Sequence, residues 1–232
     1  MQFKSLFIDF DDTLWDTYTN NKNCLEEIYT DYPFSPYYPS FEAFFNHYQP
    51  HNLELWCRYR NHEIDRYTLM IERFRHVLTP IGITDADSAL KLNNEFLKRT
   101  TGNDKTVLIP GAIDLLEYLR PYYKLYILSN GFREVQYKKL KNAGLTPYFT
   151  RVILSEDAAI QKPHKEIFDF ALQTTNSRRR ESLMIGDNWE ADIEGAHNSR
   201  IAQLWFNPHH LSARNFSPTY TVHSLSEIKN IL

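Results

Sequence analysis

The chain has 232 residues, of which 42% are hydrophobic and 24% are charged, so it can bury a sizeable core without disulfides. This composition excludes a disordered or fibrous protein. The formal net charge is −3 and the only dense cationic run is Arg178-Arg179-Arg180, which argues against a nucleic-acid polymer as partner. With two cysteines and no stretch of about 18 apolar residues, we expect a soluble cytoplasmic protein without a membrane partner.

The first predicted element is a strand over residues 3–10. It is rich in large apolar and aromatic side chains and runs into the carboxylates of Asp9, Asp11 and Asp12, as a buried parallel strand does when it meets a polar loop. From residue 17 to about residue 106 the pattern is helical instead. We expect helices near residues 17–30, 40–48, 52–64, 67–78 and 86–101, with a loop between the first two that contains three prolines.

After residue 110 the pattern alternates between strands and helices. Strands are expected at residues 124–129, 151–154, 182–185 and 202–206, and helices at 112–120, 133–143, 165–173, 188–199 and 224–232. Gly144 is placed to end one helix, and Ser224 with Glu227 has the spacing of a capping box. The alternation predicts a Rossmann-like three-layer α/β/α fold around a parallel sheet. We assign residues 1–16 and 107–232 to this core and residues 17–106 to an inserted all-helical cap domain.

Polar side chains follow the predicted strands, where ligands bind in open parallel sheets. The first strand ends at Asp9 and Asp11, and the strand at 182–185 is followed by Asp187. If these carboxylates converge, their mutual repulsion calls for a cation among them. Oxygen ligands with few protein carboxylates are typical of a Mg²⁺ site that also holds a phosphate. The pattern therefore predicts a magnesium-dependent site.

Two further groups are suited to bind the phosphate itself. Ser129 ends the strand at 124–129, and Lys162 lies in a later loop, so that a hydroxyl and an ammonium can meet the phosphate oxygens. Asp9 and Asp11 are two residues apart, which places both side chains on one side of an extended chain. One can then attack phosphorus while the other handles the proton. Each signal alone is more typical of a turn or a helix cap, but their order along the chain predicts phosphoryl transfer.

These motifs resemble the signature of a known family. Asp9-x-Asp11-x-Thr13, Ser129, Lys162-Pro163 and Gly186-Asp187 with Asp192 are similar to the four motifs of the haloacid dehalogenase superfamily, in its phosphatase branch. The motifs span residues 9–192, and the helical insertion takes the place of that family's C1-type cap. One residue departs from the pattern, because Asp12 stands where many relatives have glycine. Aspartate tolerates turn conformations, so we expect the site to be intact.

The resemblance implies a role for each matched position. Asp9 is the implied nucleophile, which forms an aspartyl-phosphate, and Asp11 is the implied general acid and base. Mg²⁺ would be held by Asp9, the backbone carbonyl of Asp11 and Asp187, while Asp192 would orient a metal-bound water. The transferring phosphoryl group would be bound by Ser129, Asn130 and Lys162, and Thr13 would shape the turn.

A branch of the family is also similar. Residues 52–56, 130–132 and 205–210 look like the corresponding segments of pyrimidine 5′-nucleotidases of the YjjG type. This similarity implies that the substrate is a small phosphate ester, a nucleoside monophosphate. Trp56 and Phe132 are our candidates for substrate binding, since aromatic rings can stack on a base. Any one such aromatic residue is more often part of a core.

Several alternatives stay open at this point. The phosphate ester could instead be phosphoglycolate or a sugar phosphate, and a β-phosphoglucomutase-like mutase would carry the same four motifs. A haloacid dehalogenase is disfavoured, because displacement of a halide needs neither Mg²⁺ nor a second aspartate of this kind. A phosphoacceptor receiver module is disfavoured by the helical insertion of about ninety residues, for which such modules have no place. The protein could be a monomer or a homodimer.

Overall fold

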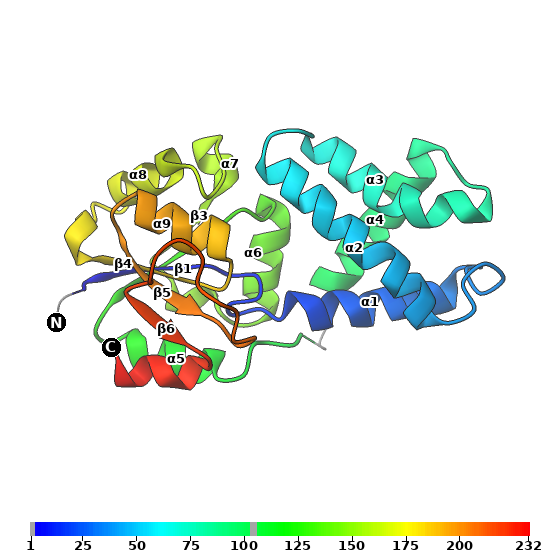
Figure 1. Ribbon diagram of the computed structural model, residues 1–232. Coiled ribbons are helices and arrows are strands. Elements are labelled where there is room, and N and C mark those ends of the chain that lie inside the picture. The colour runs from blue at the N-terminus through cyan, green and yellow to red at the C-terminus, as the bar shows by residue number, and fades with distance from the viewer. Residues whose placement is uncertain (1–2, 103–105) are drawn as a thin grey trace. The chain divides into compact units, whose positions relative to one another are not determined.

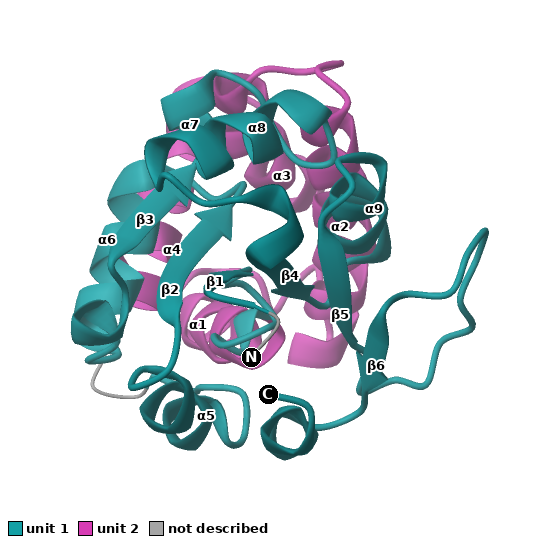
Figure 2. Cartoon of the chain, turned by 90° about the vertical axis from the view of Figure 1, so that its left-hand side faces the viewer, with its two compact units in different colours: residues 1–17, 105–232 teal, residues 18–104 magenta. Residues whose placement is uncertain are grey.

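The computed structural model describes residues 3–102 and 106–232. The chain divides into two compact units, one formed by Met1–Thr17 with Lys105–Leu232 and the other by Tyr18–Asp104 (Figure 2). The second unit is therefore inserted into the first, directly after the first strand and the turn that follows it. Among the described residues, no helix is both long enough and apolar enough to cross a membrane.

The first unit is built on a six-stranded parallel sheet with the strand order β3-β2-β1-β4-β5-β6 (Figure 1). The strand that begins the chain lies inside the sheet, between β2 and β4, and is buried throughout. The bounds are β1 Ser5–Ile8, β2 Lys124–Ser129, β3 Arg151–Leu154, β4 Ser182–Gly186, β5 Ala202–Phe206 and β6 Tyr220–Val222. The predicted three-layer α/β fold is confirmed.

Strand β1 contributes apolar side chains to both faces of the sheet. Leu6 and Ile8 pack into one core with the leucines of α5 (Ala112–Leu119), whereas Phe7 packs into a second core with Phe168 of α8 (Lys165–Thr174). Successive residues of a strand point to opposite faces, so a sheet covered on both sides needs apolar residues at every position. Each core belongs to one face of the same sheet.

The remaining helices of the first unit are short. They are α6 (Arg133–Asn142), α7 (Ser155–Ala158) and α9 (Gly195–Asn198), with 3₁₀ turns at Thr146–Tyr148 and Arg179–Glu181. The helix predicted at 188–199 is a π-helix over Trp189–Glu194 followed by α9, and the one at 224–232 is a 3₁₀ helix over Leu225–Asn230. The capping box was wrong, because the Ser224 hydroxyl donates to the Glu227 carboxylate rather than accepting from a backbone N–H. Gly144 follows α6 with a φ of 69°, as predicted.

In the described part of the second unit there are four helices, α1 (Thr17–Asp31), α2 (Phe41–Arg60), α3 (Arg66–Leu78) and α4 (Ala86–Thr101), with a 3₁₀ turn at Thr79–Ile81. The prediction of separate helices at 40–48 and 52–64 was wrong, since α2 continues through Pro50. One face of α2 buries Phe44, Tyr48 and Leu55, and this burial outweighs the hydrogen bond that proline removes. The side chains of Ser40, Asp65 and Asp85 cap α2, α3 and α4.

Candidate active site

The turn after β1 brings Asp9 and Asp11 to the carboxyl end of the sheet. The Asp9 N–H donates to the Ile185 carbonyl of β4 (2.8 Å), which continues the ladder beyond the strand. Asp12 adopts a φ of 59°, and its carboxylate accepts the Thr17 N–H (2.9 Å), so the turn is closed by its own side chain. Asp12 thus takes the left-handed conformation for which glycine is favoured.

Three carboxylates converge beyond β1 and β4. Oxygens of Asp9, Asp187 and Asp192 lie within 4.8 Å of one another, and Asp192 is fully buried. Gly186 makes this approach possible, because a Cβ at that position would lie 2.3 Å from the Asp192 carboxylate. The predicted convergence of Asp9 and Asp187 is present, and Asp192 joins them. The Asp11 carboxylate, which was expected in the same cluster, is held by other residues instead.

The electrostatics of this cluster favour a bound cation. Burial raises the pKa of Asp9 to about 8. The Lys162 ammonium opposes this rise, and the charges of Asp192 and Asp11 add to it. Burial and the charges of Asp9 and Asp192 likewise raise the pKa of Asp187 well above its usual value. Carboxylates that repel one another in this way fit a divalent metal ion, which favours oxygen ligands and relieves the repulsion.

Lys162 occupies the centre of the site. Its ammonium donates to Asp9 Oδ1 (2.6 Å), Asp192 Oδ1 (2.6 Å) and the Leu128 carbonyl (2.7 Å), and its side chain is 2% exposed. Although burial disfavours the charged form, the two carboxylates raise the pKa of Lys162 above its usual value. Asn130 exchanges two hydrogen bonds with the Lys162 backbone, both 2.9 Å. The Asn130 side chain therefore holds the lysine loop, and its contact with a phosphate stays a prediction.

Asp11 is held at both of its carboxylate oxygens. Lys139 Nζ (2.6 Å) and Thr17 Oγ1 (3.0 Å) donate to Oδ1, and Gln136 Nε2 donates to Oδ2 (2.5 Å). Burial alone would raise the pKa of Asp11, but the Lys139 ammonium and the hydrogen bonds from Gln136 and Thr17 outweigh it and lower that pKa. Gln136 Nε2 also donates to Ser129 Oγ (3.1 Å), so the predicted acid and the predicted phosphate-binding hydroxyl share one partner.

Sequence reasoning missed several residues that support this arrangement. Thr13 Oγ1 donates to Asp187 Oδ1 (3.0 Å) and accepts the Asp187 N–H (3.1 Å), which is more than the turn-shaping role expected of it. Trp205 Nε1 donates to the Asp187 carbonyl (2.9 Å). Gln136 and Lys139 are buried on the same face of α6 as Leu140, and the polar sequence of this helix does not reveal that burial.

The two candidates for substrate binding differ in exposure. Phe132 is 3% exposed in the first unit, at the N-cap of α6. Trp56 is half-buried on α2 of the second unit, with its ring edge-to-face with Tyr59 at 5.8 Å. Both assignments stay predictions, and Trp56 is the one whose ring is more open to a ligand.

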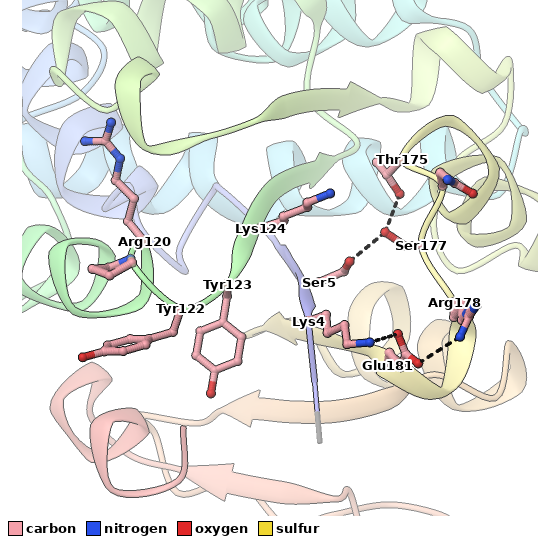
Figure 3. A pocket seen from close by; sticks show the side chains of 12 residues that line it. Lys4, Ser5, Arg120, Tyr122, Tyr123, Lys124, Thr175, Ser177, Arg178 and Glu181 are labelled. Atoms are coloured by element: carbon pink, nitrogen blue, oxygen red, sulfur yellow. Dashed lines mark hydrogen bonds and ion pairs between the residues drawn. The ribbon is translucent and has the colours of Figure 1, made fainter. Parts of the chain in front are cut away.

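A hollow of about 650 Å³ lies at the other end of the sheet (Figure 3). It is lined by Lys4 and Ser5 at the start of β1 and by Lys124 at the start of β2, whereas the carboxylates follow the ends of the strands. Its cationic side chains are exposed, and Lys4 pairs with Glu181 at 3.0 Å. The hollow therefore takes no part in the site described above.

The parallel sheet, the carboxylate cluster at its carboxyl edge and the buried lysine define a class of hydrolase. A family model of haloacid dehalogenase-like hydrolases matches residues 3–200, and the chain belongs to that family. The chain is 34% identical over its full length to the pyrimidine 5′-nucleotidase YjjG of Escherichia coli (strain K12), of which it covers 99%. It is 31% identical to the pyrimidine 5′-nucleotidase PynA of Streptococcus pneumoniae (strain ATCC BAA-255 / R6), with 98% of that protein covered.

A solved structure agrees with the sequence relatives. The HAD-hydrolase YfnB from Bacillus subtilis, crystallised bound to magnesium, matches with a TM-score of 0.87 at 28% identity, covering 100% of this chain and 99% of that one. The resemblance found from the motifs, both to the family and to its nucleotidase branch, is confirmed.

Proposed function

We propose that the protein is a magnesium-dependent phosphomonoester hydrolase whose substrates are pyrimidine nucleoside 5′-monophosphates. The observation that carries the phosphatase activity is the pair of aspartates after β1: Asp9 touches Lys162 and faces the carboxylate cluster, while Asp11 is held separately by Lys139 and Gln136. A nucleophile and a proton carrier are the two groups that hydrolysis through a covalent intermediate requires. The identity to two pyrimidine 5′-nucleotidases supports the choice of substrate.

The reaction follows from these positions in two displacements. A carboxylate oxygen of Asp9 attacks phosphorus, the bond from phosphorus to the ester oxygen breaks, and the protonated form of Asp11 gives its proton to the departing alkoxide. Because Lys139, Gln136 and Thr17 lower the pKa of Asp11, this protonated form is the minor one at neutral pH. Asp11, now a carboxylate, then takes a proton from the water that attacks the aspartyl-phosphate, so that orthophosphate leaves and both aspartates return to their first state. Lys162 and Ser129 would bind the phosphoryl oxygens in both steps.

Asp9, Asp187 and Asp192, with the backbone carbonyl of Asp11, are the groups that would hold Mg²⁺. When bound, the ion supplies positive charge that offsets the repulsion between the Asp9 carboxylate and the phosphate dianion. Lys162 already contributes one positive charge beside Asp9. The chain's own residues therefore meet a phosphate with less repulsion than three carboxylates alone would cause.

A panel of phosphate esters tests this function. Phosphate release would be measured from uridine and thymidine monophosphates, phosphoglycolate, a hexose phosphate and p-nitrophenyl phosphate, with Mg²⁺ and in excess EDTA. We expect turnover only with the metal and the highest kcat/KM on the pyrimidine monophosphates. Undiminished turnover in EDTA would contradict the metal requirement. A preference for phosphoglycolate or a sugar phosphate would contradict the assignment as a nucleotidase but not the assignment as a phosphatase. Conversion of a sugar phosphate to its isomer would indicate a mutase.

Trp56 is the residue through which we test recognition of the base. Stacking of an aromatic ring on a base contributes about 1–3 kcal/mol, which corresponds to about 5- to 150-fold in kcat/KM. Trp56→Ala should therefore lower kcat/KM for uridine monophosphate much more than for p-nitrophenyl phosphate, at an unchanged melting temperature. Tyr67→Ala, an exposed aromatic residue of α3, serves as the control. An equal loss on both esters would assign Trp56 to packing.

A further inference from the structure

We propose that Gln136 and Lys139 are positioning residues for the proton transfers of Asp11. This inference rests on the proposed function, in which Asp11 protonates the leaving alkoxide and then deprotonates water. Gln136 and Lys139 lie three residues apart on α6, so both side chains leave the same face of the helix. That face meets Asp11, with one side chain on each carboxylate oxygen.

Lys139 is a buried lysine whose charged partner is Asp11. Its side chain is 7% exposed, its ammonium is 2.6 Å from Asp11 Oδ1, and the ring of Trp15 lies 5.3 Å away. A buried ammonium is costly unless a charged partner meets it with good geometry, and here that partner is a predicted catalytic group. The neighbouring Lys138 on the same helix is exposed, as a lysine on a helix surface normally is.

Gln136 fits a space that the chain leaves for it. A Cβ at Gly131 would lie 1.7 Å from Gln136 Nε2, so only glycine at 131 lets the amide reach Asp11. The two N–H groups of the amide serve Asp11 Oδ2 and Ser129 Oγ, while its oxygen is buried and has no hydrogen-bond partner in the described part of the chain. A buried acceptor without a partner is unfavourable, so the side chain is kept for its two donors.

Holding both oxygens removes the rotational freedom of the Asp11 side chain. A general acid or base works only within hydrogen-bond reach of the atom that gains or loses the proton, and proton transfer of this kind is worth about 10² to 10⁴ in rate. Without Lys139 or Gln136, the Asp11 carboxyl group is still present but spends less time in the orientation that proton transfer requires. We therefore expect a loss of about 10- to 100-fold, smaller than the loss caused by removing Asp11.

The test uses the leaving group. The aryloxide of p-nitrophenyl phosphate leaves without a proton, whereas an alkoxide needs one, so the best alkyl ester from the panel is compared with p-nitrophenyl phosphate by kcat/KM. Lys139→Met and Gln136→Met should lower kcat/KM for the alkyl ester by about 10- to 100-fold and for the aryl ester by less than about threefold. Lys139→Arg should retain most of the activity, and Lys138→Met is the matched control on the same helix. Asp11→Asn should show the same selectivity with a larger loss.

A double-mutant cycle decides whether the two residues act through Asp11. In an Asp11→Asn background, Lys139→Met should have no further effect on the alkyl ester, and inhibition by inorganic phosphate should be unchanged in the Lys139 variants. An equal loss on both esters, a full loss in the Asp11→Asn background, or weaker phosphate inhibition would overturn the inference. If Lys139→Met fails to fold, Gln136→Met and Lys139→Arg decide by the same criteria. Retained alkyl-ester activity in Asp11→Asn would instead contradict the proposed function.

Discussion

In the proposed function Asp9 is the nucleophile, and Lys162 is the neighbour that opposes the effect of burial on its charged form. Lys162 donates to it at 2.6 Å, and the Asp192 carboxylate shares the same ammonium. The lysine contacts Asp9 through Oδ1, so in the proposed reaction Oδ2 is the oxygen that would attack phosphorus.

Asp9→Asn should remove turnover and leave the fold intact. An amide is a poor nucleophile, and Lys162 keeps Asp192 and the Leu128 carbonyl as acceptors, so we expect a melting temperature close to that of the wild type. The measurement is kcat on p-nitrophenyl phosphate with purified, folded protein. A variant that retains more than about one hundredth of the wild-type rate would speak against Asp9 as the nucleophile.

At the scale of the element, the helical unit depends on a buried polar pair. Arg73 of α3 donates to Asn93 of α4 through Nε at 2.8 Å, and its guanidinium lies over the rings of Phe74 and Phe96. Both Arg73 and Asn93 are buried. The pair joins α3 to α4 and gives the buried guanidinium an acceptor.

Asn93→Leu should lower the free energy of unfolding of this unit by about 2–3 kcal/mol, because a hydrogen bond to a charged group is lost and the guanidinium stays buried. Chemical denaturation measures the change, with Lys91→Ala, an exposed position on the same helix, as the control. The double variant Arg73→Met/Asn93→Leu should recover much of the loss. A single variant as stable as the wild type would contradict this role of the pair.

Three histidines form a stack on the same unit, and it should make stability depend on pH. The His76 ring lies between those of His47 and His51, at 4.0 and 4.1 Å. Burial first, and then the charges of His51 and His47, lower the pKa of His76 below its usual value of 6.5, while Glu54 opposes them. The unfolded chain thus binds a proton before the folded chain does, and stability falls as pH drops below about 6.5.

His76→Asn should remove this part of the pH dependence. The melting temperature would be followed from about pH 7.5 to pH 5.5, across the usual pKa of histidine, for the wild type, His76→Asn and His209→Asn. We expect the decline to be smaller in His76→Asn than in the wild type, and His209→Asn, an exposed histidine, to behave as the wild type. The same decline in all three proteins would exclude the stack as its source.

Predictability from the sequence differed between elements for physical reasons. Strands β2, β3, β4 and β5 are largely apolar runs of four to six residues and lie where they were expected. Strand β6 was not predicted, because it has only three residues and no apolar run. The helix boundary predicted near Pro50 was wrong, because the sequence shows the local penalty of proline but not the packing of the α2 face.

The candidate site was predictable where residues follow strands, and less so where a helix supplies them. Asp9 and Asp187 could be placed together because parallel strands end at one edge. Gln136 and Lys139 could not, since their role depends on the direction of one helix face. The role of Trp205 could not be predicted either, because its side chain contacts the Asp187 carbonyl of the neighbouring strand's loop, and strand order is not visible in the sequence.

At the scale of the whole molecule, the proposed mechanism requires that the phosphoryl group be covalently bound to the protein during each turnover. The most direct measurement mixes the enzyme with substrate and Mg²⁺, quenches it in acid within one turnover, and maps the peptides by mass spectrometry. We predict a phosphoryl group on the peptide that contains Asp9, absent from Asp9→Asn and still formed in Asp11→Asn with p-nitrophenyl phosphate. An enzyme that turns over substrate without any phosphorylated peptide, or with the label away from Asp9, would contradict the account.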